Sequence, residues 1–298
     1  MENTINLKDA SEKISPTAKL VAYLRSFTDI PFASEIALES GAEQAFRELA
    51  GQSAERIVRL VPIWEARYKA TGQILAQRNI TQILEIAAGL SPRGLAMTAN
   101  PQVVYVVTDL PEMLAQIESI AGAILTGSGA TRPNQHFQTV NGLDQESLWA
   151  AVSVFETQQP IAIISEGLLP YLNRTEKVAL AGNIRQLLCK YNGVWITSDV
   201  STIQTWGIIA DSDRHIPQRI SHISDSTQTN LKMNAFIDEN DVKQFFSEAG
   251  FVIQEYPQAN TFEALSSIKR LNLDPPEIVT IQRVLQDLKT VILTPKKA

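Results

Sequence analysis

The stretch ITQILEIAAGLSPRGL, residues 80–95, decides the fold. It begins as a short apolar run rich in β-branched residues, passes through the small residues AAG, and continues as a helical pattern. Four similar runs follow, QVVYVVT from Gln102, HFQTV from His136, IAIIS from Ile161 and GVWITS from Gly193. Helical patterns separate these runs, and this alternation predicts βα units that build a mostly parallel sheet.

Two more strands are predicted towards the end of the sequence. The segment DENDVKQFFSEAG predicts a helix with Asp238 as its N-cap and Gly250 as its stop. FVIQEY from Phe251 and TVILTP from Thr290 are then typical of strands. The expected sheet therefore has seven strands, and its last pair places one antiparallel strand at the edge of an otherwise parallel sheet.

The residues before the first strand are predicted to form a helical cap. Apolar residues recur at helical spacing in TAKLVAYL and in ERIVRLVPIWEARYKATGQIL, so residues 15–77 should be helical, with a turn near residues 28–32. No strand pattern precedes residue 80. We therefore expect a cap over residues 1–79 and an α/β core over residues 80–298.

Two stretches of the core, about 200–235 and about 257–287, do not fit the βα repeat. Insertions of this length after sheet strands usually form caps or lids. The chain shows no internal repeat and no linker rich in Pro, Gly or Ser. Residues 1–298 are therefore expected to form a single domain.

The composition disfavours several kinds of partner. Of 298 residues, 26 are Lys or Arg and 32 are Asp or Glu, which gives a net charge of −6, and no basic run could track a phosphate backbone. No stretch approaches the roughly 20 apolar residues of a membrane helix or resembles a signal peptide. The single cysteine, Cys189, forms no internal disulfide and is expected to be buried as a small apolar residue. We expect a cytoplasmic protein with no nucleic-acid or membrane partner.

The loop after the first strand gives the strongest indication of a ligand. In doubly wound sheets, ligands bind beyond the carboxyl ends of the strands. The small residues between Glu85 and Gly94 would let backbone N–H groups approach a ligand closely. Asp109 closes the second strand 20 positions after Gly89, where a carboxylate can accept both hydroxyls of a ribose.

Two classes of cofactor share this geometry. A nicotinamide dinucleotide needs a G-x-G-x-x-G cradle for its pyrophosphate, but only Gly89 and Gly94 are glycines here, and Glu85 would repel that group. S-adenosylmethionine carries an ammonium and a sulfonium, which a carboxylate attracts. The residues therefore favour S-adenosylmethionine, and a nicotinamide-dependent oxidoreductase remains an alternative.

Three motifs carry a resemblance to a known family. ILEIAAGLSPRGL, YVVTDLPEML and IAIISEGLLPYL resemble the leucine carboxyl methyltransferase-like family of class I S-adenosylmethionine-dependent methyltransferases. That family includes bacterial O-methyltransferases of the polyketide-biosynthesis type. The opening SPTAKLVAYLRSFTDIPFASEIA also resembles it, so the resemblance covers about residues 15–199. It implies a Rossmann-like class I methyltransferase fold with S-adenosylmethionine as cofactor.

The resemblance also implies which residues contact the cofactor. Glu85, Ala87 and Gly89 are assigned to its methionine end, and Asp109 and Leu110 to its ribose. Asn141, Gly142 and Leu143 are assigned to the adenine, and Glu166 and Gly167 to the surroundings of the methyl group. Arg67 matches an arginine that binds the cofactor carboxylate in family members, where a guanidinium can pair in bidentate fashion.

Two positions depart from the family pattern. Ala87 stands where the family has the first glycine of E-x-G-x-G, and Asn141 stands where many relatives have Asp. A side chain at Ala87 is tolerable if φ there is negative. Asn141 can still offer its amide oxygen to the adenine amino group. Both departures should weaken cofactor binding without abolishing the site.

Few residues indicate the methyl acceptor. Arg25, Tyr171 and Trp206 are the candidates for its side of the site. His215 and His222, with Asp residues nearby, match no ligand motif, so no metal is expected. No His, Asp or Glu stands out as a general base, which favours an acceptor that is a carboxylate or an acidic phenol or enol.

The sequence therefore predicts an S-adenosylmethionine-dependent O-methyltransferase that acts on a carboxylate or hydroxyl of a small molecule. Two further alternatives remain open. One is methylation of a protein's C-terminal carboxyl group, as the family's name implies. The other is a catalytically silent methyltransferase-like protein that binds the cofactor or a partner. The residues give no indication of the oligomeric state.

Overall fold

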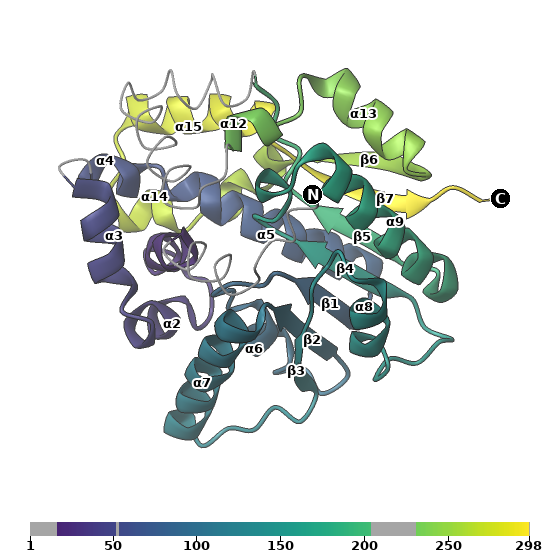
Figure 1. The fold of residues 1–298 in the computed structure, drawn as a ribbon. Helices are drawn as coiled ribbons and strands as arrows, with labels where there is room; N and C mark the ends of the chain where they lie inside the picture. The colour runs from purple at the N-terminus through teal and green to yellow at the C-terminus, as the bar shows by residue number, and fades with distance from the viewer. Residues whose placement is uncertain (1–16, 52–53, 204–230, 298) are drawn as a thin grey trace, which may run out of the picture.

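The protein is described by a computed structural model over residues 17–51, 54–203 and 231–297. A seven-stranded sheet forms its centre, with helices on both faces (Figure 1). In chain order the strands are β1 Gln82–Ile86, β2 Val104–Asp109, β3 Gln135–Thr139, β4 Ile161–Ser165, β5 Val194–Thr197, β6 Phe251–Pro257 and β7 Lys289–Pro295. All seven predicted strands are therefore present.

The strand order is β3-β2-β1-β4-β5-β7-β6. The first five strands of this order are parallel, and β7 is antiparallel to both of its neighbours, β5 and β6. The predicted seven-stranded, mostly parallel sheet is thus confirmed. Within the last pair, β6 is outermost and the antiparallel β7 lies one position further in. This order follows from burial, since β7 is buried from Thr290 to Leu293 whereas β6 alternates and exposes Val252.

Both faces of the sheet are covered by helices. Side chains of α8 Gln145–Ala151, α9 Arg174–Tyr191 and α13 Glu239–Glu248 pack on one face, and those of α5 Val61–Arg78, α6 Arg93–Met97 and α7 Pro111–Ser128 pack on the other. Successive strand residues alternate between these two layers, as Leu84 and Ile83 do in β1. The central strands β1 and β4 are consequently buried at every position.

Side-chain caps define the starts of helices around the sheet. Asp144 caps α8, and Asn173 forms a capping box with Glu176 at the start of α9. Asp238 accepts a hydrogen bond from the Asp241 N–H at the start of α13, and Gly250 follows its end with φ +85°, both as predicted. These caps fix the helices whose preceding loops border the carboxyl ends of the strands.

The described chain before β1 is helical and contains no strand, as predicted. Residues 17–25 are helical, and α2 Ala33–Glu39, α3 Ala42–Ala50 and α4 Ala54–Arg59 precede α5. The insertion after β6 forms η3 Gln258–Ala264, α14 Ser267–Arg270 and α15 Pro275–Asp287. Glu65 of α5 is fully buried and accepts hydrogen bonds from the N–H and hydroxyl groups of Ser266 and Ser267. This insertion is therefore fastened to the N-terminal helices.

Cys189 is exposed on α9, so the prediction of a buried thiol is wrong. Leu187 and Leu188 turn towards the core, and the next helical position rotates about 100° away from it. Within the described ranges, no helix has both the length and the apolar character that crossing a membrane requires.

Candidate functional site

Four carboxylates stand at the carboxyl ends of four adjacent strands. Asp109 ends β2 and Glu85 is the penultimate residue of β1, while Glu166 follows β4 and Asp199 follows β5. The strands lie in the order β2-β1-β4-β5. Strands β1 to β3 are added towards one edge of the sheet and β4 and β5 towards the other, so the strand order reverses between β1 and β4. The groups therefore surround the switch point at which doubly wound sheets bind ligands.

Asp109 binds the turn that follows β1. Its carboxylate accepts hydrogen bonds from the N–H of Gly89 and the N–H of Leu110, each at 2.8 Å. Burial raises the pKa of Asp109 to about 6, against the opposing effect of these two N–H groups. Asp109 is only half-buried, and a carboxylate has about four acceptor sites, so it retains capacity for further hydrogen bonds. The predicted ribose contact requires that capacity.

The turn after β1 contains two residues in the left-handed region, Ala87 with φ +53° and Gly89 with φ +52°. The condition under which a side chain at Ala87 is tolerable, a negative φ, is therefore not met. The turn imposes this conformation, because the next two N–H groups, of Ala88 and Gly89, are bonded to Thr108 O and to Asp109. An alanine in this region costs about 1 kcal/mol that a glycine does not.

Glu85 lies beneath this turn and is 2% exposed. Its carboxylate accepts hydrogen bonds from the Ser91 hydroxyl at 2.9 Å and the Tyr105 hydroxyl at 2.7 Å, and Arg93 Nε lies 3.8 Å away. Burial raises the pKa of Glu85, and Arg93 opposes that shift. Glu85 thus fixes the loop from below. The contact with a cofactor's methionine end, which the resemblance implies, stays a prediction.

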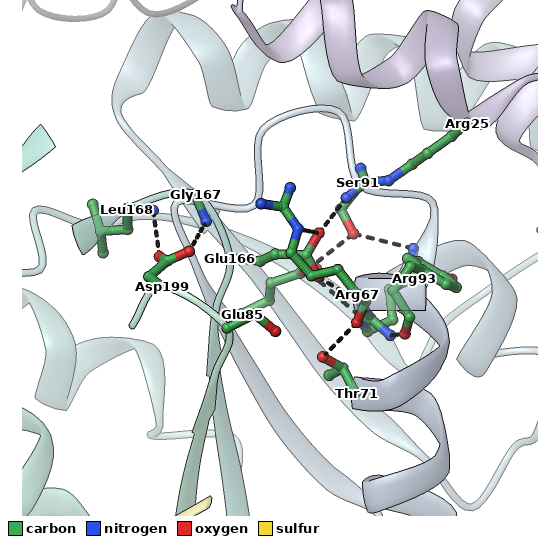
Figure 2. Close-up of polar contacts among 12 residues, drawn as sticks. Arg25, Arg67, Thr71, Glu85, Ser91, Arg93, Glu166, Gly167, Leu168 and Asp199 are labelled. Carbon is green, nitrogen blue, oxygen red and sulfur yellow. Dashed lines mark hydrogen bonds and ion pairs between the residues drawn. The ribbon is translucent and has the colours of Figure 1, made fainter. Parts of the chain in front are cut away.

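Three arginines converge on the carboxylate of Glu166 (Figure 2). Arg25 Nη2 and Arg67 Nε lie 2.5 and 3.1 Å from Oε1, and Arg93 Nη2 lies 3.2 Å from Oε2. Burial would raise the pKa of Glu166, but the three guanidinium groups lower it to about 2. Glu166 is therefore a permanent anion at neutral pH.

Arg25 and Arg93 are buried members of this cluster. Arg25, predicted as a substrate contact, is 6% exposed and uses Nη2 to bind Glu166. Arg93 is 1% exposed, stacks its guanidinium 3.9 Å from the centre of the Tyr68 ring and donates to Tyr68 O. The sequence does not single out Arg93, because an arginine at a helix start is most often solvated.

Arg67 is the accessible member of the cluster, with 24% of its side chain exposed. Its Nε binds Glu166, and its backbone oxygen accepts from Thr71 (Figure 2). Among the residues that the structure describes, neither terminal nitrogen of Arg67 has a hydrogen-bond or ion-pair partner. In the predicted anion-binding residue, two nitrogens are therefore left open to a ligand by the part of the chain that the structure describes.

Asp199 holds the turn that follows β4, and sequence reasoning misses it. Its carboxylate accepts hydrogen bonds from the N–H groups of Gly167 at 2.8 Å, Leu168 at 2.7 Å and Leu169 at 3.1 Å, the first two of which Figure 2 shows. Burial raises the pKa of Asp199, against the opposing effects of Arg67 and the three N–H groups. Only the fold brings this carboxylate to a turn that lies 30 to 32 residues earlier in the chain.

The candidate adenine contacts lie in the turn after β3. Asn141 Oδ1 accepts a hydrogen bond from the Leu143 N–H at 3.1 Å, so one of its two acceptor positions is used within the turn. A β-carbon at Gly142 would come within 2.9 Å of Leu180 Cδ1, so the Leu180 side chain would have to shift to accept one. All three residues of the turn are half-buried and keep some exposed surface.

The remaining candidates are only partly covered by the structure. The Tyr171 hydroxyl donates to Thr17 Oγ1 at 3.0 Å, which joins the loop after β4 to the N-terminal helix. Trp206, His215 and His222 lie outside the described residues. In the described part of the chain, His, Cys, Asp and Glu side chains nowhere gather in threes that could hold a metal ion.

Comparison with solved structures shows which known proteins have a similar fold. No family model matches the chain, and no curated protein matches it. A putative methyltransferase from Thermobifida fusca has 19% sequence identity and a TM-score of 0.54, over 86% of this chain and 89% of that one. A duf574 family protein from Streptomyces avermitilis has 15% identity and a TM-score of 0.55, over 94% and 97%.

The chain has the Rossmann-like fold of class I methyltransferases. Identities below 20% carry the comparison no further than the fold. The narrower resemblance to the leucine carboxyl methyltransferase-like family stays a prediction from the motifs.

Proposed function

We propose that this protein is an S-adenosylmethionine-dependent methyltransferase that methylates an oxygen of a small molecule. The observation that carries the proposal is the set of charges around the switch point. Four carboxylates, Asp109, Glu85, Glu166 and Asp199, are accompanied there by three guanidinium groups, those of Arg25, Arg67 and Arg93. The carboxyl groups outnumber the guanidinium groups by one, and Glu166 is ionised at neutral pH because the guanidinium groups lower its pKa to about 2.

This charge distribution suits S-adenosylmethionine better than a dinucleotide. The sulfonium and ammonium groups outweigh its carboxylate, so the molecule carries net positive charge, whereas the pyrophosphate of a dinucleotide is anionic. Arg67 supplies the complementary feature, because its terminal nitrogens are available for a ligand carboxylate. The likeness of the fold to a putative methyltransferase supports the same assignment.

The residues present fit this cofactor along its length. Arg67 would bind its carboxylate, and the backbone around Ala87 and Gly89 would border its methionine part. Asp109 would accept the ribose hydroxyls with the acceptor sites that Gly89 and Leu110 leave open. Asn141 to Leu143 would contact the adenine, and Glu166 with Gly167 would lie beside the methyl group.

The bound cofactor would supply an activated methyl group, so the protein's task is to align the acceptor and to exclude water. None of the candidate site residues that the structure describes stands out as a general base for the acceptor. Glu166, with a pKa of about 2, holds protons poorly, and burial raises the pKa of the Tyr171 hydroxyl. Asp109 and Asp199 are engaged with backbone N–H groups. We infer that the acceptor oxygen is already ionised in solution, as a carboxylate or an acidic phenol or enol is.

A transfer assay tests this function. The protein is incubated with methyl-labelled S-adenosylmethionine and a panel of carboxylic acids, acidic phenols and aliphatic alcohols, and label in the extracted product is counted. Treatment with mild alkali releases label from a methyl ester as methanol but not from an aryl methyl ether. We expect label in the carboxylic acids or acidic phenols and none in the alcohols.

The same assay addresses the two other candidates. Labelling of peptides with a free C-terminal carboxyl, and of no small acid, would identify a protein carboxyl methyltransferase. Cofactor binding without transfer to any member of either panel would favour a silent binding protein.

A further inference from the structure

The turns that follow β1 and β4 are held in the same way, each by a carboxylate at the end of the neighbouring strand further from the switch point. Asp109 of β2 accepts the N–H of Gly89 after β1, and Asp199 after β5 accepts the N–H of Gly167 after β4. Both glycines have positive φ, +52° and +83°. The two turns flank the switch point between β1 and β4, where the proposed function puts the methyl donor.

We propose that Asp199 is a positioning residue for methyl transfer, which acts by holding the turn that carries Glu166. The inference rests on the proposed function and adds to it a residue that no motif of the sequence indicates. Asp199 is 5% exposed and Gly167 follows Glu166 directly, so the backbone of Glu166 is anchored within one peptide bond. Its side chain is anchored separately by the three arginines.

The use of a buried carboxylate at this turn is the reason for assigning it a functional role. Among the described residues, no cation lies within ion-pair distance of Asp199. Burying a charge with no direct ion-pair partner, and only the more distant charge of Arg67 to oppose its cost, is unfavourable, and a Ser, Thr or Asn side chain can also accept backbone N–H groups. Only a carboxylate accepts with both of its terminal oxygens, and here Oδ1 serves Gly167 while Oδ2 serves Leu168 and Leu169.

Asp199 is expected to influence the sulfonium of the methyl donor through the position of the charged Glu166 side chain. A sulfonium is attracted by the Glu166 carboxylate and repelled by the guanidinium groups bound to it, whereas the thioether of the demethylated product, S-adenosylhomocysteine, is neutral. The preference for S-adenosylmethionine over S-adenosylhomocysteine therefore reports on how Glu166 is held. Asp199 is expected to sustain that preference.

Asp199→Asn tests the assignment, because the amide keeps the size of the side chain but turns one acceptor into a donor that faces an N–H group. Calorimetry would give the dissociation constants of both compounds. Hydrogen exchange would give the opening of the amides of Gly167, Leu168 and Leu169. We expect the preference for S-adenosylmethionine to fall roughly tenfold, and exchange at these amides to become at least about tenfold faster.

Two further variants make the result specific. Asp274→Asn is the matched control, since Asp274 is an exposed carboxylate that accepts one backbone N–H at the start of α15, and it should leave both readouts unchanged. In a Glu166→Gln background, Asp199→Asn should no longer change the preference, because it acts through Glu166. If Asp199→Asn does not fold, Gly167→Ala strains the same turn without a steric clash and should lower the preference in the same way.

An unchanged preference in Asp199→Asn, or an equal loss with and without Glu166, would overturn the assignment of Asp199 while leaving the proposed function intact. Failure of the unaltered protein to bind either compound would instead contradict the proposed function. Faster exchange at the three amides with no change in preference would show that Asp199 serves only the fold, and would also overturn the assignment.

Discussion

The carboxylate of Asp109 lies 2.8 Å from the backbone nitrogen of Gly89, so the end of β2 holds the turn that follows β1. In the proposed complex the same carboxylate also accepts the ribose hydroxyls. Asp109→Ala should therefore raise the dissociation constant of S-adenosylhomocysteine, measured by calorimetry, by about tenfold to a hundredfold. Asp238→Ala removes a comparable N–H acceptor at the start of α13 and should leave this constant unchanged. Equal constants for both variants would mean that Asp109 does not contact the ribose.

Cofactor binding should weaken as the pH falls below about 6. The pKa of Asp109 is raised by burial to about 6, so the carboxylate takes up a proton below that pH and loses acceptor capacity. A raised carboxyl pKa also means that this group's contribution to stability is present below its ordinary value near 4 and is lost as the pH rises through 6. Dissociation constants measured from pH 5 to 8 should show the dependence in the unaltered protein and a flatter profile in Asp109→Asn. The same slope in both proteins would assign the dependence to another group.

Glu166 should contribute strongly to stability as well as to the site. Glu166→Gln leaves buried Arg25 without its counter-ion and Arg93 with only the more distant Glu85, which should lower the free energy of unfolding by about 3–5 kcal/mol in urea denaturation at pH 7. Glu43→Gln removes an exposed ion pair with Arg47 and should leave that free energy unchanged. Because the pKa of Glu166 is lowered to about 2, its stabilising effect is present above its ordinary value near 4.5 and is lost as the pH falls towards 2. A small loss for Glu166→Gln would show that the cluster is not held together by this carboxylate.

Ala87→Gly should stabilise the protein. The φ of +53° at Ala87 strains an alanine but not a glycine, so the free energy of unfolding should rise by about 0.5–1 kcal/mol, less the greater flexibility of glycine in the unfolded chain. Ala88→Gly is the control, because Ala88 lies in the same turn but is not among the positive-φ residues. This substitution should lower the free energy of unfolding. Thermal or urea unfolding of the two variants decides the matter. If neither substitution raises the free energy of unfolding, the backbone at Ala87 is not strained.

The strands could be predicted well from the sequence because β-branched runs such as IAIIS are both strongly patterned and buried on both faces. The placement of β7 between β5 and β6 depends on which of the two last strands would lose more free energy of burial at the edge of the sheet. The residue pattern of each strand alone does not give this. The helical face of Cys189 was mispredicted for a similar reason, since one position on a helix separates the core side from solvent.

The candidate site could be predicted where a residue's place in a strand end carries the information, as for Glu85, Asp109 and Glu166. It could not be predicted where the role comes from a partner distant in sequence. Arg93 acquires its role from Tyr68 and Glu166, and Asp199 acquires its role from the turn after β4. The positive φ at Ala87 is likewise set by N–H groups bonded to β2.

Calorimetric titration with S-adenosylmethionine and S-adenosylhomocysteine, with NADH as the comparison ligand, tests the central claim most directly. The charges around the switch point predict saturable binding of both adenosyl compounds at one site per chain, tighter for the positively charged S-adenosylmethionine, and no binding of NADH. Absence of binding for both adenosyl compounds, or saturable binding of NADH in their place, would contradict the assignment of this protein as a methyltransferase.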